Sequence, residues 1–199
     1  MQGDAVLGDI LLRNCLVGDV LRGLRDCPVR GLMVGSGAVA QTVWNGAHGF
    51  ELNHGIRDID VVFFGSGDED AEDAVRKLVV SCIGDPGVAI DVKDQARVHE
   101  WYPRKFGHSI RPYTSIADAI STWPTTATAV GVRLEGETLD IVAPFGLSDL
   151  LTLVVRPNRV LATESVFLEK TRRWLKTWPE LRVLSWSDGI GSPGRRWMD

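Results

Sequence analysis

The chain has 199 residues, of which 44% are hydrophobic and 24% charged, so it is long enough to bury a substantial core. Its net charge of -4 argues against a nucleic-acid-binding surface spread over the whole protein, although a local basic groove stays compatible with it. Three cysteines without metal-ligand spacing indicate reduced thiols and a cytoplasmic protein. Neither a signal peptide nor a membrane span is expected, because no apolar stretch has the required length and flanks.

The first part of the chain predicts a helix, a strand and a second helix. Residues 5–25 carry apolar side chains at helical spacing, and an apolar strand follows over 29–34. The turn 35–37 is Gly-Ser-Gly and leads into a helix over 38–44. A strand, a glycine-rich turn and a helix together direct backbone N–H groups at an anion, so this turn is a candidate anion site.

The middle of the chain predicts two more strands with a helix between them. The strand 58–64 begins with Asp-Ile-Asp and continues as an apolar run. A helix over 69–82, which Asp68 is expected to cap, leads to the strand 88–93. The loop 45–57 before these elements is rich in turn-forming residues.

The second half of the chain mixes short elements. Asp94 is expected to cap a helix over 95–101, and a basic loop rich in proline and glycine follows over 103–114. The remaining predicted elements are a helix over 115–120, a hairpin of strands 126–134 and 138–142, and helices over 147–153 and 164–176.

These elements predict an α/β (α+β) fold, with a mixed β-sheet flanked by helices and a small C-terminal hairpin and helical extension. We expect one domain over 1–182, with its core at about 29–102 and its extension at about 103–182. Residues 183–199 are expected to form a tail.

Three carboxylates on the two middle strands are the strongest chemical signal. Asp58 and Asp60 point to the same face because a strand has a period of two, and Asp91 joins them if the two strands are neighbours. Like charges repel, whereas Mg²⁺ (or Mn²⁺) binds carboxylates together with substrate phosphates, so two metal ions here would clamp a triphosphate. The plainer alternatives are a capped or salt-bridged strand end for the pair and an exposed edge position for Asp91.

Polar residues near the carboxylates supply candidate phosphate contacts. The N–H groups of Gly35 and Ser36 and the Ser36 hydroxyl are suited to the phosphates, although Ser36 also suits a helix cap. Lys93 shares the face of Asp91, so it either neutralises that carboxylate or reaches a phosphate, and Arg97 is a candidate substrate or triphosphate contact.

Several other residues have both a functional and a plain structural interpretation. Gln95 would either read a base or fix its loop. Basic residues interleaved with aromatic ones suit stacking on a nucleobase or nucleic acid, and equally a solvated loop with aromatic anchors. Those residues are Arg104, Lys105, His108 and Arg111 with Trp101, Tyr102, Phe106 and Tyr113. Lys170, Arg172 and Arg173 would either close over a triphosphate or, by default, face solvent, and Asp140 and Asp149 are interpreted as structural.

The set of an apolar strand, Gly-Ser, a helix, Asp-x-Asp and a later strand-borne acid resembles the nucleotidyltransferase superfamily typified by DNA polymerase beta. The chain further resembles a bacterial family of small nucleotidyltransferase-like proteins from about residue 35 to 181. The stretches that carry this resemblance are 37–45, 58–64, 91–99, 126–132, 143–149, 155–158 and the residues Lys170, Trp174, Trp178 and Pro179. The resemblance implies the nucleotidyltransferase fold and an NTP and Mg²⁺ site, but no particular substrate.

The sequence therefore predicts an enzyme that transfers a nucleoside monophosphate from NTP to an unknown acceptor and releases pyrophosphate. Asp58, Asp60 and Asp91 would bind metal, and Asp91 would also assist deprotonation of the acceptor. A small-molecule acceptor is favoured, and a nucleic acid or protein acceptor is possible. The alternative is a catalytically inactive module of the same fold that binds a nucleotide or a partner, which the three intact acids argue against.

Overall fold

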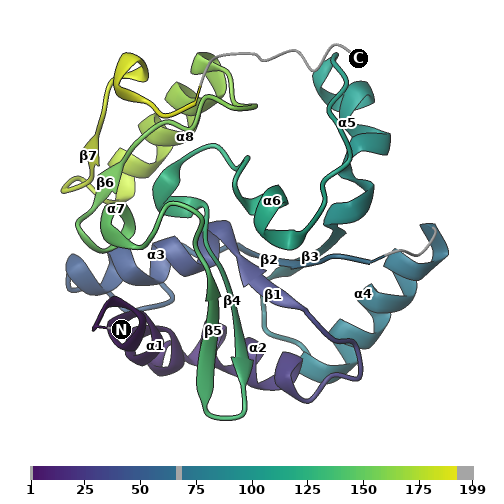
Figure 1. Ribbon diagram of the computed structural model, residues 1–199. Coiled ribbons are helices and arrows are strands. Elements are labelled where there is room, and N and C mark those ends of the chain that lie inside the picture. The colour runs from purple at the N-terminus through teal and green to yellow at the C-terminus, as the bar shows by residue number, and fades with distance from the viewer. Residues whose placement is uncertain (1, 66–68, 192–199) are drawn as a thin grey trace.

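A five-stranded mixed sheet forms the centre of the computed structural model, which describes residues 2–65 and 69–191 (Figure 1). The strand order is β3-β2-β1-β4-β5, in which β2 and β3 run parallel and the other neighbours run antiparallel. The strands are β1 Met33–Gly35, β2 Asp58–Phe63, β3 Ala89–Asp94, β4 Gly131–Glu135 and β5 Thr138–Val142. The predicted mixed sheet flanked by helices is confirmed.

Helices cover the sheet and extend beyond it. On one side α2 contacts β4, α3 contacts β2 and α4 contacts β3, and α1 contacts both α2 and α3. The α-helices are α1 Gln2–Arg13, α2 Cys15–Arg25, α3 Ser36–Ala47, α4 Glu69–Ile83, α5 Val98–Phe106, α6 Ile116–Ile120, α7 Ser148–Leu151 and α8 Glu164–Thr177. Short 3₁₀ helices are η1 Gln95–Arg97, η2 Thr126–Thr128 and η3 Trp186–Asp188, and a second sheet pairs β6 Val154–Val155 with β7 Arg182–Val183.

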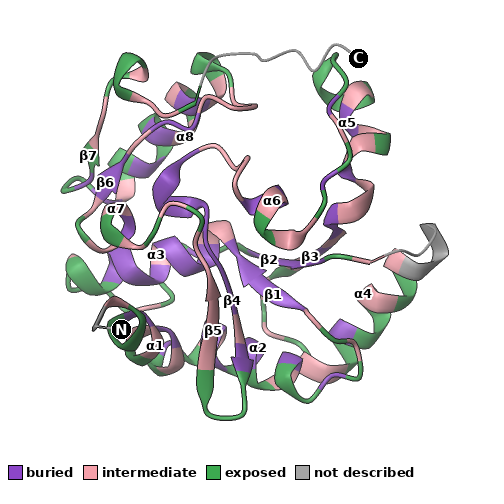
Figure 2. Cartoon of the chain, viewed as in Figure 1, coloured by how far each residue is buried: buried purple, intermediate pink, exposed green. Residues whose placement is uncertain are grey.

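The two faces of β2 have different roles. Ile59, Val61 and Phe63 alternate along the strand and lie buried in the main core, which Figure 2 shows as buried strands and inner helix faces. Asp60 and Val62 have the opposite orientation because successive strand residues alternate. Because the apolar side chains of β2 must face the core, the acidic side chains of the strand lie on its opposite face.

Tryptophans attach the C-terminal helix to α3. Trp44 is fully buried and makes edge contacts with Trp174 and Trp178, with ring centroids 5.2 and 5.4 Å apart. The Trp178 indole N–H donates a hydrogen bond of 2.7 Å to Asn45 Oδ1. These contacts fix the position of α8 relative to the sheet.

The single helix predicted over 5–25 is wrong, because the chain forms α1 and α2 with a break at Asn14. The Asn14 side chain accepts hydrogen bonds from the N–H groups of Leu16 and Val17 and so caps α2. Its amide donates to Thr42 Oγ1 and to the Leu52 carbonyl at 2.8 and 2.9 Å. The apolar spacing runs through the break, so periodicity alone does not reveal it.

Other predicted boundaries also shift for local reasons. The first strand begins at Met33 and not at 29, because Gly31 has a positive φ of 75° and turns the chain. The hairpin strand predicted over 126–134 begins only at Gly131, because 126–128 form η2, which the Thr125 hydroxyl caps. The final helix agrees with its prediction within one residue.

The predicted loop 103–114 and the predicted helix 147–153 also differ from the structure. The basic loop predicted over 103–114 is helical in α5 up to Phe106, because Val98 and Tyr102 present one buried face despite Pro103. The predicted helix 147–153 is only α7, and Leu153 with a φ of 58° ends it.

Part of the predicted tail lies in ordered structure. Residues 183–191 include the end of β7 and η3, and Ile190 exchanges backbone hydrogen bonds of 2.9 Å with Pro157 and Arg159. The expected cap at Asp68 lies outside the described residues. Within the described ranges, none of the helices has both the length and the apolar character that crossing a membrane requires.

Candidate active site

A cleft of about 730 Å³ lies over the face of β2 and β3 that points away from the core. The two strands supply its floor, and α5, the segment 122–124 and the segment 161–170 supply its walls. In Figure 1, α5, α6 and α8 surround this side of the sheet. The cleft therefore combines a charged floor with largely apolar walls.

The three carboxylates lie on one face of β2 and β3, where Asp60 and Asp91 line the cleft and Asp58 is exposed outside its lining. The parallel register of β2 and β3 places Asp60 directly beside Asp91, and Asp58 precedes Asp60 by two residues on the same face. The condition for Asp91 to join the other two acids, that the two strands are neighbours, is met. Sequence spacing alone left this open, since the residues are 31 positions apart and only the pairing brings them together.

Asp60 is the most perturbed of the three carboxylates. Burial, and after it the charges of Asp58 and Asp91, together raise the pKa of Asp60 to about 6, whereas Lys170 and Lys93 oppose the shift. Within the described chain, Asp60 forms no hydrogen bond and no ion pair. A desolvated carboxylate without a partner is costly, so this position favours binding a cation or a proton.

Two basic residues neutralise Asp91. Lys93 Nζ lies 3.3 Å from Asp91 Oδ1 and 3.6 Å from Glu72 Oε1. Arg76 Nη1 lies 4.0 Å from the same Asp91 oxygen. One of the two interpretations of Lys93 is therefore realised here, namely neutralisation of the third acid.

Lys170 enters the cleft from α8 and is half-buried. Burial lowers its pKa, and Arg173 acts in the same direction, whereas Asp60 and Asp58 oppose the shift. Lys170 makes no ion pair with any described residue, although its Nζ lies 6.0 Å from the Trp174 ring centre. Lys170 is thus less solvent-exposed than its default interpretation implies, and its place in the cleft is compatible with the functional alternative.

The carboxylates have the right chemistry for Mg²⁺ but do not form a closed ligand set. Oxygen donors from carboxylates are the ligands that Mg²⁺ prefers. In the described ranges, however, no three acidic, histidine or cysteine side chains lie close enough together to hold a metal ion. Asp91 would have to exchange its contact with Lys93 for a metal ion.

The Gly-Ser turn packs tightly beneath the cleft. A Cβ atom on Gly35 would lie 2.5 Å from Trp123 Cη2, so only glycine fits there. Ser36 lines the cleft and has a positive φ of 51°, which is strained for a serine. The Ser36 N–H donates to the Val130 carbonyl at 3.0 Å, so its hydroxyl is the group left for a ligand.

Other predicted residues divide between the cleft and the scaffold. Gln95 lines the cleft, whereas the Arg97 guanidinium donates to Glu100 at 2.7 and 3.0 Å and is not among the lining residues. Asp140 pairs with Arg133, and Asp149 accepts hydrogen bonds from Thr126 and Arg156, which is the structural role expected of both acids.

Sequence reasoning missed the lining residues that follow α6. Thr122, Trp123 and Pro124 form part of the wall, although the sequence suggests only a helix end there. The dipeptide Trp-Pro marks a stop, and no local pattern shows that this stop lies opposite the carboxylates.

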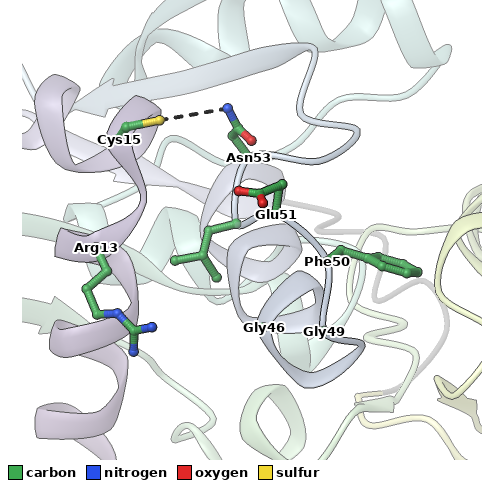
Figure 3. Close-up of a pocket in the computed structure, with 8 residues that line it drawn as sticks. Arg13, Cys15, Gly46, Gly49, Phe50, Glu51 and Asn53 are labelled. Carbon is green, nitrogen blue, oxygen red and sulfur yellow. Dashed lines mark hydrogen bonds between the residues drawn. The ribbon is translucent and has the colours of Figure 1, made fainter.

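A second hollow of about 380 Å³ lies between the α1–α2 junction and the loop after α3 (Figure 3). It contains one carboxylate, from Glu51, and Asn53 Nδ2 lies 3.8 Å from Cys15 Sγ at its edge. This second hollow lacks converging acidic residues, so the cleft over β2 and β3 is the candidate active site.

The comparisons with known proteins agree with this assignment. A family model described as nucleotidyltransferase matches residues 22–183, and the chain therefore belongs to the nucleotidyltransferase family. No curated protein matches it. Family and fold support nucleotidyl transfer as the activity and confirm the predicted resemblance.

One of the two solved structures compared with this chain has a similar fold. This NMR structure, described as revealing a CCA-adding enzyme head domain, is 25% identical, with a TM-score of 0.71. The match covers 90% of this chain and 94% of that one. A tRNA-processing enzyme in an apo form is 19% identical over 79% of this chain and 42% of its own, with a TM-score of only 0.42.

Proposed function

We propose that this protein transfers a nucleoside monophosphate from NTP to an acceptor hydroxyl or phosphate, with Mg²⁺ or Mn²⁺, and releases pyrophosphate. The observation that supports the proposal is the placement of Asp58, Asp60 and Asp91 on one face of β2 and β3, with Asp60 and Asp91 lining a cleft that also holds Lys170. When bound, the metal would neutralise the triphosphate and stabilise the developing charge.

The residues of the chain would divide the remaining tasks. Asp58 and Asp60 would hold the metal, and Asp91 would hold it and accept the proton of the acceptor. The acceptor oxygen forms a bond to the α-phosphorus, the bond from the α-phosphorus to the β-bridging oxygen breaks, and pyrophosphate leaves. Ser36 through its hydroxyl and Lys170 through its ammonium group would bind phosphate oxygens.

Loading the site would rearrange its ion pairs. Lys93 now neutralises Asp91 at 3.3 Å, and a divalent cation on that carboxylate would repel the lysine. Glu72 offers Lys93 a second partner at 3.6 Å, and a phosphate offers a third. Lys93 would thus change from a counter-ion of Asp91 to a phosphate ligand.

A small-molecule acceptor is our first proposal. The net charge of -4 offers no extended basic surface, and the described cleft is of the size of a small-molecule site. The likeness to the structure described as a CCA-adding enzyme head domain makes a nucleic acid end the second candidate. Reduced cysteines, which are free in the described structure, are compatible with a cytoplasmic location.

The test compares Asp58→Asn and Asp60→Asn with the wild-type protein. Pyrophosphate release and calorimetric binding of NTP are measured with and without Mg²⁺, and adducts with a metabolite extract are sought by mass spectrometry. Asp140→Asn, which alters an acid outside the cleft, is the matched control. Unchanged turnover and unchanged Mg²⁺-dependent binding in both variants would refute the proposal. Metal-dependent NTP binding without transfer to any acceptor would instead indicate the inactive binding module.

A further inference from the structure

We infer that Gln95 and the aromatic wall of α5 form a nucleobase site at the end of the cleft beyond the carboxylates. The inference rests on the proposed function, because it assigns the part of the nucleotide that the phosphate and metal residues would not contact. The ligand would carry a planar heteroaromatic ring with a hydrogen-bond donor next to an acceptor.

The wall supplies the flat faces that stacking needs. Trp101, Tyr102 and Phe106 of α5 all line the cleft, and the ring centres of Tyr102 and Phe106 lie 4.4 Å apart. Phe106 remains 44% exposed, although it stands beside these rings. Lys105 Nζ lies 5.7 and 5.5 Å from the ring centres of Trp101 and Phe106. Aromatic faces with a nearby cation suit an electron-rich ring next to a phosphate group.

Gln95 supplies a polar group that lacks a protein partner. It is only 6% exposed and lines the cleft, yet its amide makes no hydrogen bond to any described residue. The amide atoms themselves are not buried, so they reach the cleft, and a ligand can pair with them without displacing a protein partner. The amide presents a carbonyl acceptor beside an N–H donor, which matches the edge of a nucleobase.

The backbone next to Gln95 is firmly held, which fixes where its side chain enters the cleft. Asp94 Oδ1 accepts hydrogen bonds of 2.9 Å from the N–H groups of both Ala96 and Gly65. The Asp94 N–H in turn donates to Glu72 Oε2 at 3.0 Å. Glu72 also contacts Lys93, so the same network links Gln95 to the charged floor.

The position of Gln95 along the chain also fits a nucleotide. Asp91 and Asp94 are the third and last residues of β3, and the rise of a strand places them about 10 Å apart. Gln95 follows directly. A phosphate end at Asp91 and a ring at Gln95 would leave the intervening length for a sugar.

The nucleobase has two possible sources, the donor NTP or a nucleoside unit of the acceptor. The test therefore measures binding of ATP, CTP, GTP and UTP with Mg²⁺, of inorganic tripolyphosphate with Mg²⁺, and of the four nucleosides alone. Calorimetry and tryptophan fluorescence are the readouts, which need no turnover. Gln95→Leu and Phe106→Ala are compared with Gln41→Leu, in which the altered glutamine lies outside the cleft lining.

We expect Gln95→Leu to weaken binding of the preferred NTP about tenfold and to reduce discrimination among the bases. Phe106→Ala should weaken all NTPs by about tenfold as well, because stacking tolerates every base. Tripolyphosphate binding should stay unchanged in both variants, and Gln41→Leu should behave as the wild type. If Gln95→Leu binds every NTP and every nucleoside with the affinity of the wild type, the inference is refuted.

The nucleosides separate the inference from the proposed function. Nucleoside binding that depends on Gln95, without any Mg²⁺-dependent triphosphate binding, would support the base site and refute the proposed transfer. If NTP displaces the nucleoside, the site binds the donor base. If both bind together and only nucleoside binding depends on Gln95, the site binds the acceptor. No nucleoside binding combined with base-independent NTP binding would overturn the inference alone.

Discussion

Replacing Lys170 by methionine tests whether this lysine is present for a ligand or for the fold. The lysine is half-buried, has a lowered pKa because of its burial, and makes no ion pair with the described residues. An unpaired, half-buried cation destabilises the protein without ligand, whereas a bound phosphate would provide the missing partner. A charge-assisted hydrogen bond of this kind contributes about 2 kcal/mol, which corresponds to about 30-fold in affinity.

We therefore expect Lys170→Met to bind Mg²⁺-tripolyphosphate about 30-fold more weakly, measured by calorimetry, without a fall in melting temperature. Methionine keeps the apolar stem that packs in α8, so the change isolates the charge. Lys176→Met, on an exposed position of the same helix, is the matched control and should alter neither quantity. A lower melting temperature with unchanged affinity would show that Lys170 is structural and refute the reasoning.

Three further predictions concern the scaffold around the cleft. Gly35→Ala should lower the free energy of unfolding by about 1–3 kcal/mol in urea, because its Cβ would lie 2.5 Å from Trp123; an unchanged midpoint would contradict this. Arg111 lowers the pKa of Asp118 to about 2 from its ordinary 3.8, so this carboxylate stabilises the fold above about pH 4 and stops doing so as the pH falls towards 2. Arg111→Met should remove that part of the acid dependence, about 2 kcal/mol at most in pH-dependent unfolding, whereas an identical pH profile would refute the assignment. Trp44→Leu should cost about 3 kcal/mol in urea unfolding, because a fully buried ring between two tryptophans is lost, and a cost below 1 kcal/mol would refute that packing role.

Much of the fold follows from short-range patterns in the sequence. The apolar alternation of 58–64 predicts β2 and its buried face, and the helical spacing of 164–176 predicts α8 within one residue. The break at Asn14 was not predictable in the same way. Its side chain caps α2, and its amide is held by Thr42 and Leu52, which are distant in sequence. A period of 3.6 residues contains no information about such partners.

One feature of the candidate site follows from the sequence, and the others depend on the tertiary structure. The sequence by itself determines that Asp58 and Asp60 share a face, because that depends only on the period of a strand. Tertiary structure alone decides that Asp91 lies beside Asp60, that Lys170 enters the cleft and that the Gln95 amide is left without a partner. The physical reason is that strand pairing and helix docking set distances between residues far apart in the chain, and desolvation of a side chain depends on all the elements that surround it.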